Sequence, residues 1–273
     1  MKLNVLRADP AGNITLFVLD PIERERRAAL AAELMRRLPD MKIDQVGFAC
    51  PADADTDGRM EMMGGEFCGN ASRSAAAWAL ACDGGEQGVY DVSCSGCDTV
   101  LPAKVARKGE GTYEAFIEMP YPEDVSGILI AVDDFPARFF RVDLPGITHF
   151  VHFVPSLEGL DKEKYWTILQ DYVDGEDLPA YGLVLCDTKK GEMIPAVYVR
   201  DTDTLYWENS CGSGSAAVAA ALACTTHKNV TCYMKQPGGT LAIAAKVSEK
   251  GDLQQIFIGG PVTLGEVETV TIS

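Results

Sequence analysis

Positive charge is scarce in this sequence relative to negative charge. The 273 residues include 24 Lys and Arg against 40 Asp and Glu, which gives a formal net charge of −16 at pH 7. A strongly negative protein is repelled by nucleic-acid phosphates and by anionic lipid headgroups. The composition therefore argues against a nucleic-acid partner and against binding to a membrane surface.

Long apolar stretches are also lacking. The longest apolar run, Ala216–Cys224, is too short to span a bilayer, because a transmembrane helix needs about 20 apolar residues. The first residues, Met1–Asp9, lack the uninterrupted apolar stretch of a secretory signal peptide. We therefore expect a cytoplasmic protein, and its 47% of hydrophobic residues are enough for a sizeable core.

A disulfide framework is not expected either. The chain has nine cysteines, an odd number, and the cytosol keeps thiols reduced. Most of these residues should be small buried apolar side chains. A thiol becomes reactive only where the local electrostatic field favours the thiolate, so the position of each cysteine decides its chemistry.

Patterns of apolar residues predict strands in both halves of the chain and few clear helices. Four predicted strands are Ile14–Leu19, Ala115–Met119, Phe150–Val154 and Ala196–Val199. The three predicted helices are Pro21–Leu38, which is amphipathic, and the Ala-rich and largely apolar segments Asn70–Cys82 and Ser213–Cys224.

The two Ala-rich segments have the same entrance. Each follows a Cys, a Gly and a small polar residue: Cys68, Gly69 and Asn70 in the first, and Cys211, Gly212 and Ser213 in the second. The two cysteines are 143 residues apart, about half the chain. This weak repeat predicts an α+β fold with two similar lobes, each a mostly antiparallel sheet or barrel around a central helix.

Proline and glycine suggest where the lobes meet in the sequence. Tyr121-Pro122 interrupts structure, and Gly259-Gly260-Pro261 reads as a turn before a last strand, Val267–Ile272, that returns to the first lobe. We therefore expect residues 1–122 and 259–273 to form an N-terminal lobe, and residues 123–258 to form a C-terminal lobe.

The two Cys-Gly loops have the properties of a site for an amino acid. A helix N-terminus offers unpaired N–H groups that bind a carboxylate and lower the pKa of a thiol. Two such loops across a cleft would place Cys68 and Cys211 on opposite sides of one Cα. One thiolate would remove the α-proton while the other thiol delivers a proton, as in a racemase that needs no cofactor.

Other arrangements of Cys and His carry less weight. A lone Cys-Gly before a helix is usually just a tight turn, and only the pair suggests function. Cys94 and Cys97 form a CxxC pattern, but a tetrahedral metal site needs two further ligands, and none is suitably spaced. His149 and His152 would lie on opposite faces of a strand. We expect no bound metal.

The motifs resemble those of the diaminopimelate epimerase superfamily. Glu66–Asn70 is similar to its first catalytic segment and Cys211–Gly214 to its second. Further matches follow in family order: Gly12-Asn13, Asp44-Gln45, Gly146–His149 and Pro237–Leu241. The resemblance implies the two-lobed fold, with the catalytic cysteines at the lobe interface and the last strand in the first lobe.

The resemblance also implies roles for individual residues. Cys68 and Cys211 would be the acid–base pair, and the substrate would be bound by Asn13, Gln45, Gly69, Asn70, His149, Gly212 and Ser213. Glu208 would contact a polar substrate side chain or bind a backbone amide. The expected partner is a small amino acid, no cofactor is expected, and assembly as a homodimer is left open.

Departures from the superfamily pattern bear on the substrate. The groups that hold the second amino-acid head of diaminopimelate are largely missing: Met62-Met63-Gly64 replaces a segment with Asn, and no Glu-Arg-Gly stretch precedes Cys211. Each lost partner would leave a substrate charge unpaired at about 1–3 kcal/mol. Glu208–Gly214 instead resembles the histidine racemase branch, so histidine is the first choice.

The sequence is also compatible with several other functions. The chain could be a diaminopimelate epimerase, a racemase of another amino acid, or a thiol nucleophile such as an amidase, which needs only one cysteine. A proton-shifting isomerase of the phenazine-biosynthesis type lacks the thiol pair. A non-catalytic amino-acid-binding protein on the same scaffold would keep both cysteines passive.

Overall fold

A computed structural model of the chain describes residues 1–52, 54–200 and 203–272. The chain divides into two units, the first made of Met1–Glu118 and Ile258–Ser273 and the second of Met119–Phe257. In the described residues, no helix is both long and apolar enough to cross a membrane.

The first unit is a closed sheet around one helix. Its elements are β1 (Lys2–Asp9), β2 (Thr15–Val18), α1 (Arg24–Arg37), the 3₁₀ turn η1 (Pro39–Met41), β3 (Gln45–Cys50), β4 (Gly58–Met62), α2 (Gly69–Asp83), β5 (Gln87–Cys94), β6 (Leu101–Gly109), β7 (Thr112–Glu118) and the last part of β16 (Leu253–Thr271). The strands follow the order β1 to β7 and then β16, and β16 also pairs with β1, which closes the sheet.

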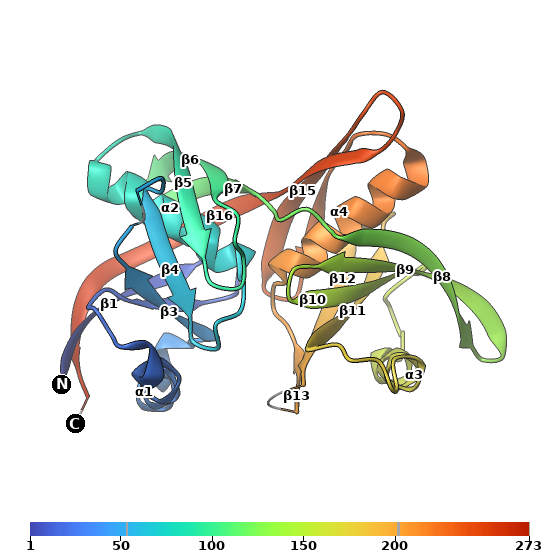
Figure 1. Cartoon of the computed structure of the whole chain (residues 1–273), viewed down its shortest axis with the longest axis horizontal. Helices are drawn as coiled ribbons and strands as arrows, with labels where there is room; N and C mark the ends of the chain where they lie inside the picture. Colours follow the sequence, from blue (N-terminus) through green and yellow to red (C-terminus); the bar gives the residue numbers. More distant parts are fainter. Residues whose placement is uncertain (53, 201–202, 273) are drawn as a thin grey trace. The chain divides into compact units, whose positions relative to one another are not determined.

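Helix α2 passes through this barrel, whereas α1 lies outside it over β3 (Figure 1). The buried side of α2 is made mostly of small residues such as Ala71, Ala76 and Ala77, all 0% exposed. Small side chains let the surrounding strands approach the helix closely, as the close packing of protein interiors requires. The barrel therefore fixes the position of the helix and of the loop that precedes it.

The second unit likewise arranges its strands around one helix. Its elements are β8 (Asp124–Val132), β9 (Phe135–Leu144), β10 (Ile147–Phe153), α3 (Lys162–Tyr172), β11 (Ala180–Asp187), β12 (Glu192–Val199), β13 (Thr204–Trp207), α4 (Gly212–Thr226), β14 (Val230–Gln236), β15 (Gly239–Val247) and the first part of β16. The strand order is β8-β9-β10-β11-β12-β14-β15-β16, with β13 beside β12. Helix α4 packs on the strands from β8 to β11 and on β14 and β15.

The same connections recur in both units. In the first unit α1 links the parallel pair β2 and β3, and α2 links the parallel pair β4 and β5. In the second unit α3 links the parallel pair β10 and β11, and α4 lies between the parallel strands β12 and β14. The predicted fold class, two similar mostly antiparallel lobes each with a central helix, is confirmed.

Two local predictions need correction. Gly259-Gly260-Pro261 is not a turn but part of the uninterrupted strand β16. Gly259 serves packing there, because a Cβ at this position would lie 2.0 Å from the Phe116 ring. Helix α3 was not recognised in the sequence. Its buried residues Trp166 and Leu169 join the core of the second unit, and this tertiary packing stabilises a short helix.

Candidate active site

Cys68 lies at the N-terminus of α2 and is its capping residue. Its Sγ accepts a hydrogen bond from the backbone N–H of Ala71 at 3.4 Å. Nε2 of Gln45, the first residue of β3, donates to the same sulfur at 3.2 Å and to Oγ1 of Thr15 at 2.8 Å. Donors that point at a sulfur favour its anionic form, so this arrangement suits a thiolate.

Cys211 has the same position at the N-terminus of α4. Its Sγ accepts a hydrogen bond from the N–H of Gly214 at 3.3 Å and lies 3.5 Å from Oγ of Ser213. The backbone N–H of Cys211 donates to Oε1 of Gln236 at 2.8 Å. The two thiols therefore cap their helices in the same way, because each accepts the N–H of the residue three positions later in the chain.

Cys211 differs from an ordinary thiol in its surroundings. The residue is only 3% exposed. Burial raises its pKa well above the usual value, and the carboxylate of Glu208, which hydrogen-bonds the thiol, raises it further. The hydrogen bonds from Ser213 and Gly214 oppose this shift. Because a nearby anion disfavours a thiolate, these surroundings favour the protonated thiol.

His149 lies behind Ser213 and is fully buried. Its Nε2 and the Ser213 hydroxyl are hydrogen-bonded at 2.8 Å. Burial lowers the pKa of His149 to about 3, so the imidazole is neutral near pH 7. The ring occupies space that Gly182 on β11 leaves open, since a Cβ there would lie 2.4 Å from Nδ1. His149 thus supports the Cys211 loop through Ser213.

Asn70 is also fully buried, and its Oδ1 accepts a hydrogen bond from Nε of Arg73 at 3.1 Å. Gly69 and Gly212 are the first residues of α2 and α4. Asn13 lies in the loop between β1 and β2, beside Ile14, whose carbonyl accepts the N–H groups of Asp44 and Gln45. The structure thus brings Gln45 to Cys68 and places Asn70 behind the same loop.

A family model described as the histidine racemase CntK N-terminal domain matches residues 2–268. The chain belongs to this family. The predicted resemblance to the histidine racemase branch is confirmed, and the protein is an amino-acid racemase or epimerase. A histidine racemase of Fusobacterium nucleatum subsp. nucleatum is 31% identical to it over 267 residues, 96% of this chain and 94% of that protein. A histidine racemase of Staphylococcus aureus is 25% identical over 251 residues, 87% of this chain and 86% of that protein.

Solved structures of low sequence identity share the fold of this histidine racemase family member. A Bacillus anthracis phenazine biosynthesis protein of the PhzF family has a TM-score of 0.68 at 15% identity and covers 100% of both chains. A hydroxyproline epimerase of Agrobacterium vitis, solved with bound trans-4-hydroxy-L-proline, has a TM-score of 0.65 at 13% identity, with 98% of this chain and 91% of that chain covered.

Some residues around the thiols of this family member were not recognised in the sequence. Thr15, Arg73, Ser72 and Gln236 all take part in the hydrogen bonds of the two loops. Of these, only Ser72 left a signal, because it lies four residues after Cys68, as Ser215 does after Cys211, and each serine donates to the carbonyl of its cysteine. The others come from distant parts of the chain and carry no local pattern.

The CxxC segment supports the Cys68 loop. Oγ of Ser95 donates to the carbonyl of Glu66 and accepts the N–H of Met62, both at 2.8 Å. The thiol of Cys94 is hydrogen-bonded by the backbone of Cys68, and burial raises its pKa. Among the described residues, His, Cys, Asp and Glu do not gather into a group of three or more that could hold a metal.

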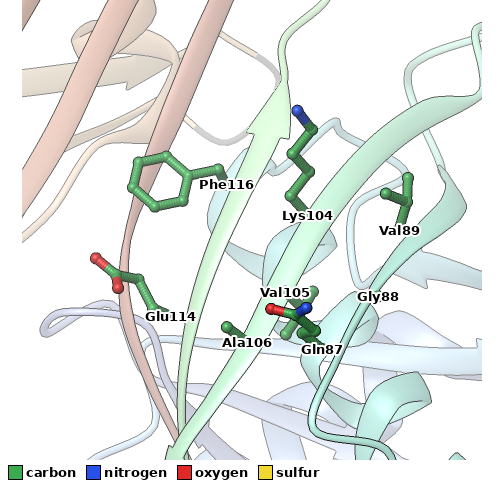
Figure 2. Close-up of a pocket in the computed structure, with 8 residues that line it drawn as sticks. All are labelled: Gln87, Gly88, Val89, Lys104, Val105, Ala106, Glu114 and Phe116. Carbon is green, nitrogen blue, oxygen red and sulfur yellow. The ribbon is translucent and has the colours of Figure 1, made fainter.

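Two surface cavities of the first unit lie away from Cys68 and Gln45. One, of about 400 Å³, is lined by residues of β5, β6 and β7; Figure 2 shows the residues that line it, among them Glu114 and Phe116 of β7. A second, of about 350 Å³, is bounded by the Cys94–Val100 segment together with Arg24 and Arg59. Neither is lined by Cys68 or by its hydrogen-bond partner Gln45.

Proposed function

We propose that this member of the histidine racemase family interconverts the two enantiomers of histidine, with Cys68 and Cys211 as its two acid–base groups. One observation carries the proposal: the two thiols have equivalent positions in the two units. Each caps a largely buried, Ala-rich helix, and each sulfur accepts the N–H of the residue three positions later. The two lobes would each supply one half of the active site.

The helix ends provide the binding of the substrate carboxylate. The first N–H groups of a helix have no intrahelical acceptor and form the positive end of its dipole. Gly69 and Gly212 occupy the first helical positions, where the absence of a side chain lets a carboxylate approach the backbone. These donors also stabilise the negative charge that spreads onto the carboxylate when Cα loses its proton.

The reaction is then a transfer of protons on opposite faces of Cα. The thiolate of one cysteine takes the α-proton, and the thiol of the other gives its proton to the opposite face. Only protons are transferred between the enzyme and the substrate. The two cysteines have exchanged protonation states when the opposite enantiomer leaves. The proposed mechanism requires no cofactor, because the helix N–H groups stabilise the intermediate carbanion.

Histidine is the proposed substrate for two reasons. The relatives that match the chain over most of its length are named histidine racemases. The chain also lacks the Arg and several of the Asn residues that would pair with the distal charges of diaminopimelate, at about 1–3 kcal/mol for each unpaired group. A single-headed amino acid avoids this loss.

Deuterium incorporation tests the proposal directly. The enzyme is incubated in D2O with a panel of L-amino acids and with diaminopimelate, and Cα labelling and chiral composition are followed together. We expect histidine to be labelled and racemised fastest. Cys68→Ala and Cys211→Ala should each abolish racemisation, whereas Cys82→Ala, at an exposed thiol near the end of α2, should not.

Each alternative predicts a different outcome. Faster labelling of another amino acid would replace histidine as the substrate. Full activity of Cys211→Ala would contradict the two-base mechanism and favour a single thiol nucleophile. Binding of histidine without labelling by the folded wild-type protein would indicate a non-catalytic binding protein.

A further inference from the structure

Arg73 is a fully buried cation whose hydrogen bonds all go to neutral groups. It lies on α2, five residues after Cys68, and is 0% exposed. Its guanidinium donates to Oδ1 of Asn70 at 3.1 Å and to the carbonyls of Pro10, Gly260 and Pro261 at 2.8, 3.0 and 3.0 Å. Within the described residues, none of these acceptors is a carboxylate.

Burying a cation without an anionic partner lowers the stability of the folded protein, which points to a functional role for the charge. A buried cation is usually paired with an anion, because the loss of hydration is otherwise uncompensated. Burial lowers the pKa of Arg73 to about 9, which still leaves it protonated near pH 7. The groups whose negative charge acts in the opposite direction are the thiolate of Cys68 and the carboxylate of Asp9. The interaction is mutual, so the cation also stabilises the thiolate.

The other charged groups near this end of α2 affect the ionisation of Cys68 less than Arg73 does. Asp9 is partly exposed and pairs with Arg7 at 3.4 Å, so its charge is partly compensated. Burial raises the pKa of Glu66, two residues before Cys68, and so disfavours its negatively charged form. Arg73 is the charged group that the fold shields from water, and interactions are strongest where water is excluded.

The Cys211 loop has the opposite electrostatic character. The residue five positions after Cys211 is Ala216, so α4 has no cation at the position equivalent to Arg73. The neutral side chain of Gln236 accepts the Cys211 N–H there. The charged group that contacts the Cys211 thiol is the carboxylate of Glu208, which disfavours a thiolate.

We infer that Arg73 is a positioning residue that makes Cys68 the thiolate and leaves Cys211 the thiol in the resting protein. It also fixes the Cys68 loop by joining Asn70 to the strand segment Gly260-Pro261. The enantiomer whose α-proton faces Cys68 is therefore deprotonated by the resting form, and the other enantiomer requires the exchanged protonation state. The catalytic consequence rests on the proposed function, but the order of ionisation does not.

The order of ionisation is measured by alkylation in the wild-type protein. Iodoacetamide reacts with thiolates, so its rate at each cysteine follows the ionised fraction. Brief alkylation across a pH series, followed by mass spectrometry of the peptides that contain Cys68 and Cys211, gives a midpoint for each thiol. We expect the Cys68 midpoint to lie at lower pH. A lower midpoint for Cys211 would overturn the inference without any variant.

Two variants separate the charge of Arg73 from its packing. Arg73→Met removes the charge and should raise the Cys68 midpoint by about one pH unit or more, while the Cys211 midpoint stays unchanged as an internal control. Arg73→Lys keeps the charge and should retain most of the wild-type midpoint despite losing hydrogen bonds. An unchanged Cys68 midpoint in folded Arg73→Met, verified by circular dichroism, would overturn the assigned role. Loss of amino-acid labelling with an intact order of ionisation would instead count against the proposed function.

Discussion

Nε2 of His149 lies 2.8 Å from the hydroxyl oxygen of Ser213, so a fully buried imidazole supports a hydroxyl that contacts the Cys211 thiol. His149 is held neutral, because burial lowers its pKa from 6.5 to about 3. The hydrogen bond to Ser213 joins His149 to the Cys211 loop, and its contact with the substrate stays a prediction.

This burial predicts a specific loss of stability in acid. Between about pH 6.5 and about pH 3 the unfolded chain binds a proton at His149 and the folded chain does not, so stability falls as the pH falls. The slope contributed by this one group is up to about 1.4 kcal/mol per pH unit. Urea unfolding across this range should show a shallower decline for His149→Gln than for the wild type.

The matched control is His227→Asn. His227 is exposed and caps the end of α4 in a left-handed conformation that Asn tolerates well. This variant gives the reference slope for the removal of an exposed imidazole. Because His149→Gln can lower stability at every pH, the comparison concerns the slope and not the absolute free energy of unfolding. Equal slopes for His149→Gln and the wild type would contradict the assignment of a buried neutral imidazole.

The packing of His149 against β11 leads to a second prediction, on the stability of a variant at Gly182. A Cβ added at Gly182 would lie 2.4 Å from Nδ1 of His149 and 2.8 Å from the carbonyl oxygen of Ala196. Gly182→Ala should therefore destabilise the protein by about 1–3 kcal/mol, the usual cost of overpacking a core, and should lower activity by displacing the ring. Thermal or urea unfolding measures the loss.

Gly58→Ala is the control for this substitution. Gly58 also lies in a strand, but a Cβ there would meet nothing closer than 3.8 Å. We expect a change of no more than about 0.5 kcal/mol. If Gly182→Ala were as stable as Gly58→Ala, the ring of His149 could not occupy the position described.

The parts of this molecule that sequence patterns predicted well are those encoded locally. The helices predicted over Asn70–Cys82 and Ser213–Cys224 correspond to α2 (Gly69–Asp83) and α4 (Gly212–Thr226), because a capping side chain and an Ala-rich run lie next to each other in the chain. The family resemblance rested on the same short segments and gave the class of enzyme.

The contacts that organise the site depend instead on residues far apart in sequence. Arg73 reaches the carbonyl of Gly260, 187 residues away, and Gln236 receives the N–H of Cys211 across 25 residues. No local periodicity encodes such pairings. Asn70 and His149 are both fully buried, and their partners Arg73 and Ser213 show no pattern in the sequence that would predict this burial.

Gln45 provides a third prediction, on the Cys68 side. Its Nε2 donates to the Cys68 sulfur at 3.2 Å, and a hydrogen bond to an ionised group contributes about 1.5–3 kcal/mol. Gln45→Leu should therefore lower the turnover number for histidine racemisation by about tenfold or more, measured by chiral chromatography. Gln45→Glu should be worse still, because it places a carboxylate beside the sulfur.

Thr15→Val tests whether the orientation of the amide matters. The Thr15 hydroxyl accepts the second bond from Nε2 at 2.8 Å, so its loss should loosen Gln45 without removing the donor. We expect a smaller decrease in turnover than for Gln45→Leu. If Gln45→Leu racemised histidine at the wild-type rate, the bond to Cys68 would have no role in catalysis.

Glu208 provides the last prediction, on the Cys211 side. Its carboxylate hydrogen-bonds the Cys211 thiol and raises the pKa of that thiol, beyond the larger effect of burial. Glu208→Gln removes the negative charge but keeps the shape, so Cys211 should ionise at lower pH and its alkylation curve should shift accordingly, while the Cys68 curve stays in place. A larger fraction of Cys211 would then be ionised, and racemisation near neutral pH should slow because fewer molecules hold a thiol that can donate its proton. Glu192→Gln, which only breaks a surface ion pair with Lys235 at 3.1 Å, should leave both curves and the rate unchanged. A Cys211 curve that does not move in Glu208→Gln would show that burial alone keeps this thiol protonated.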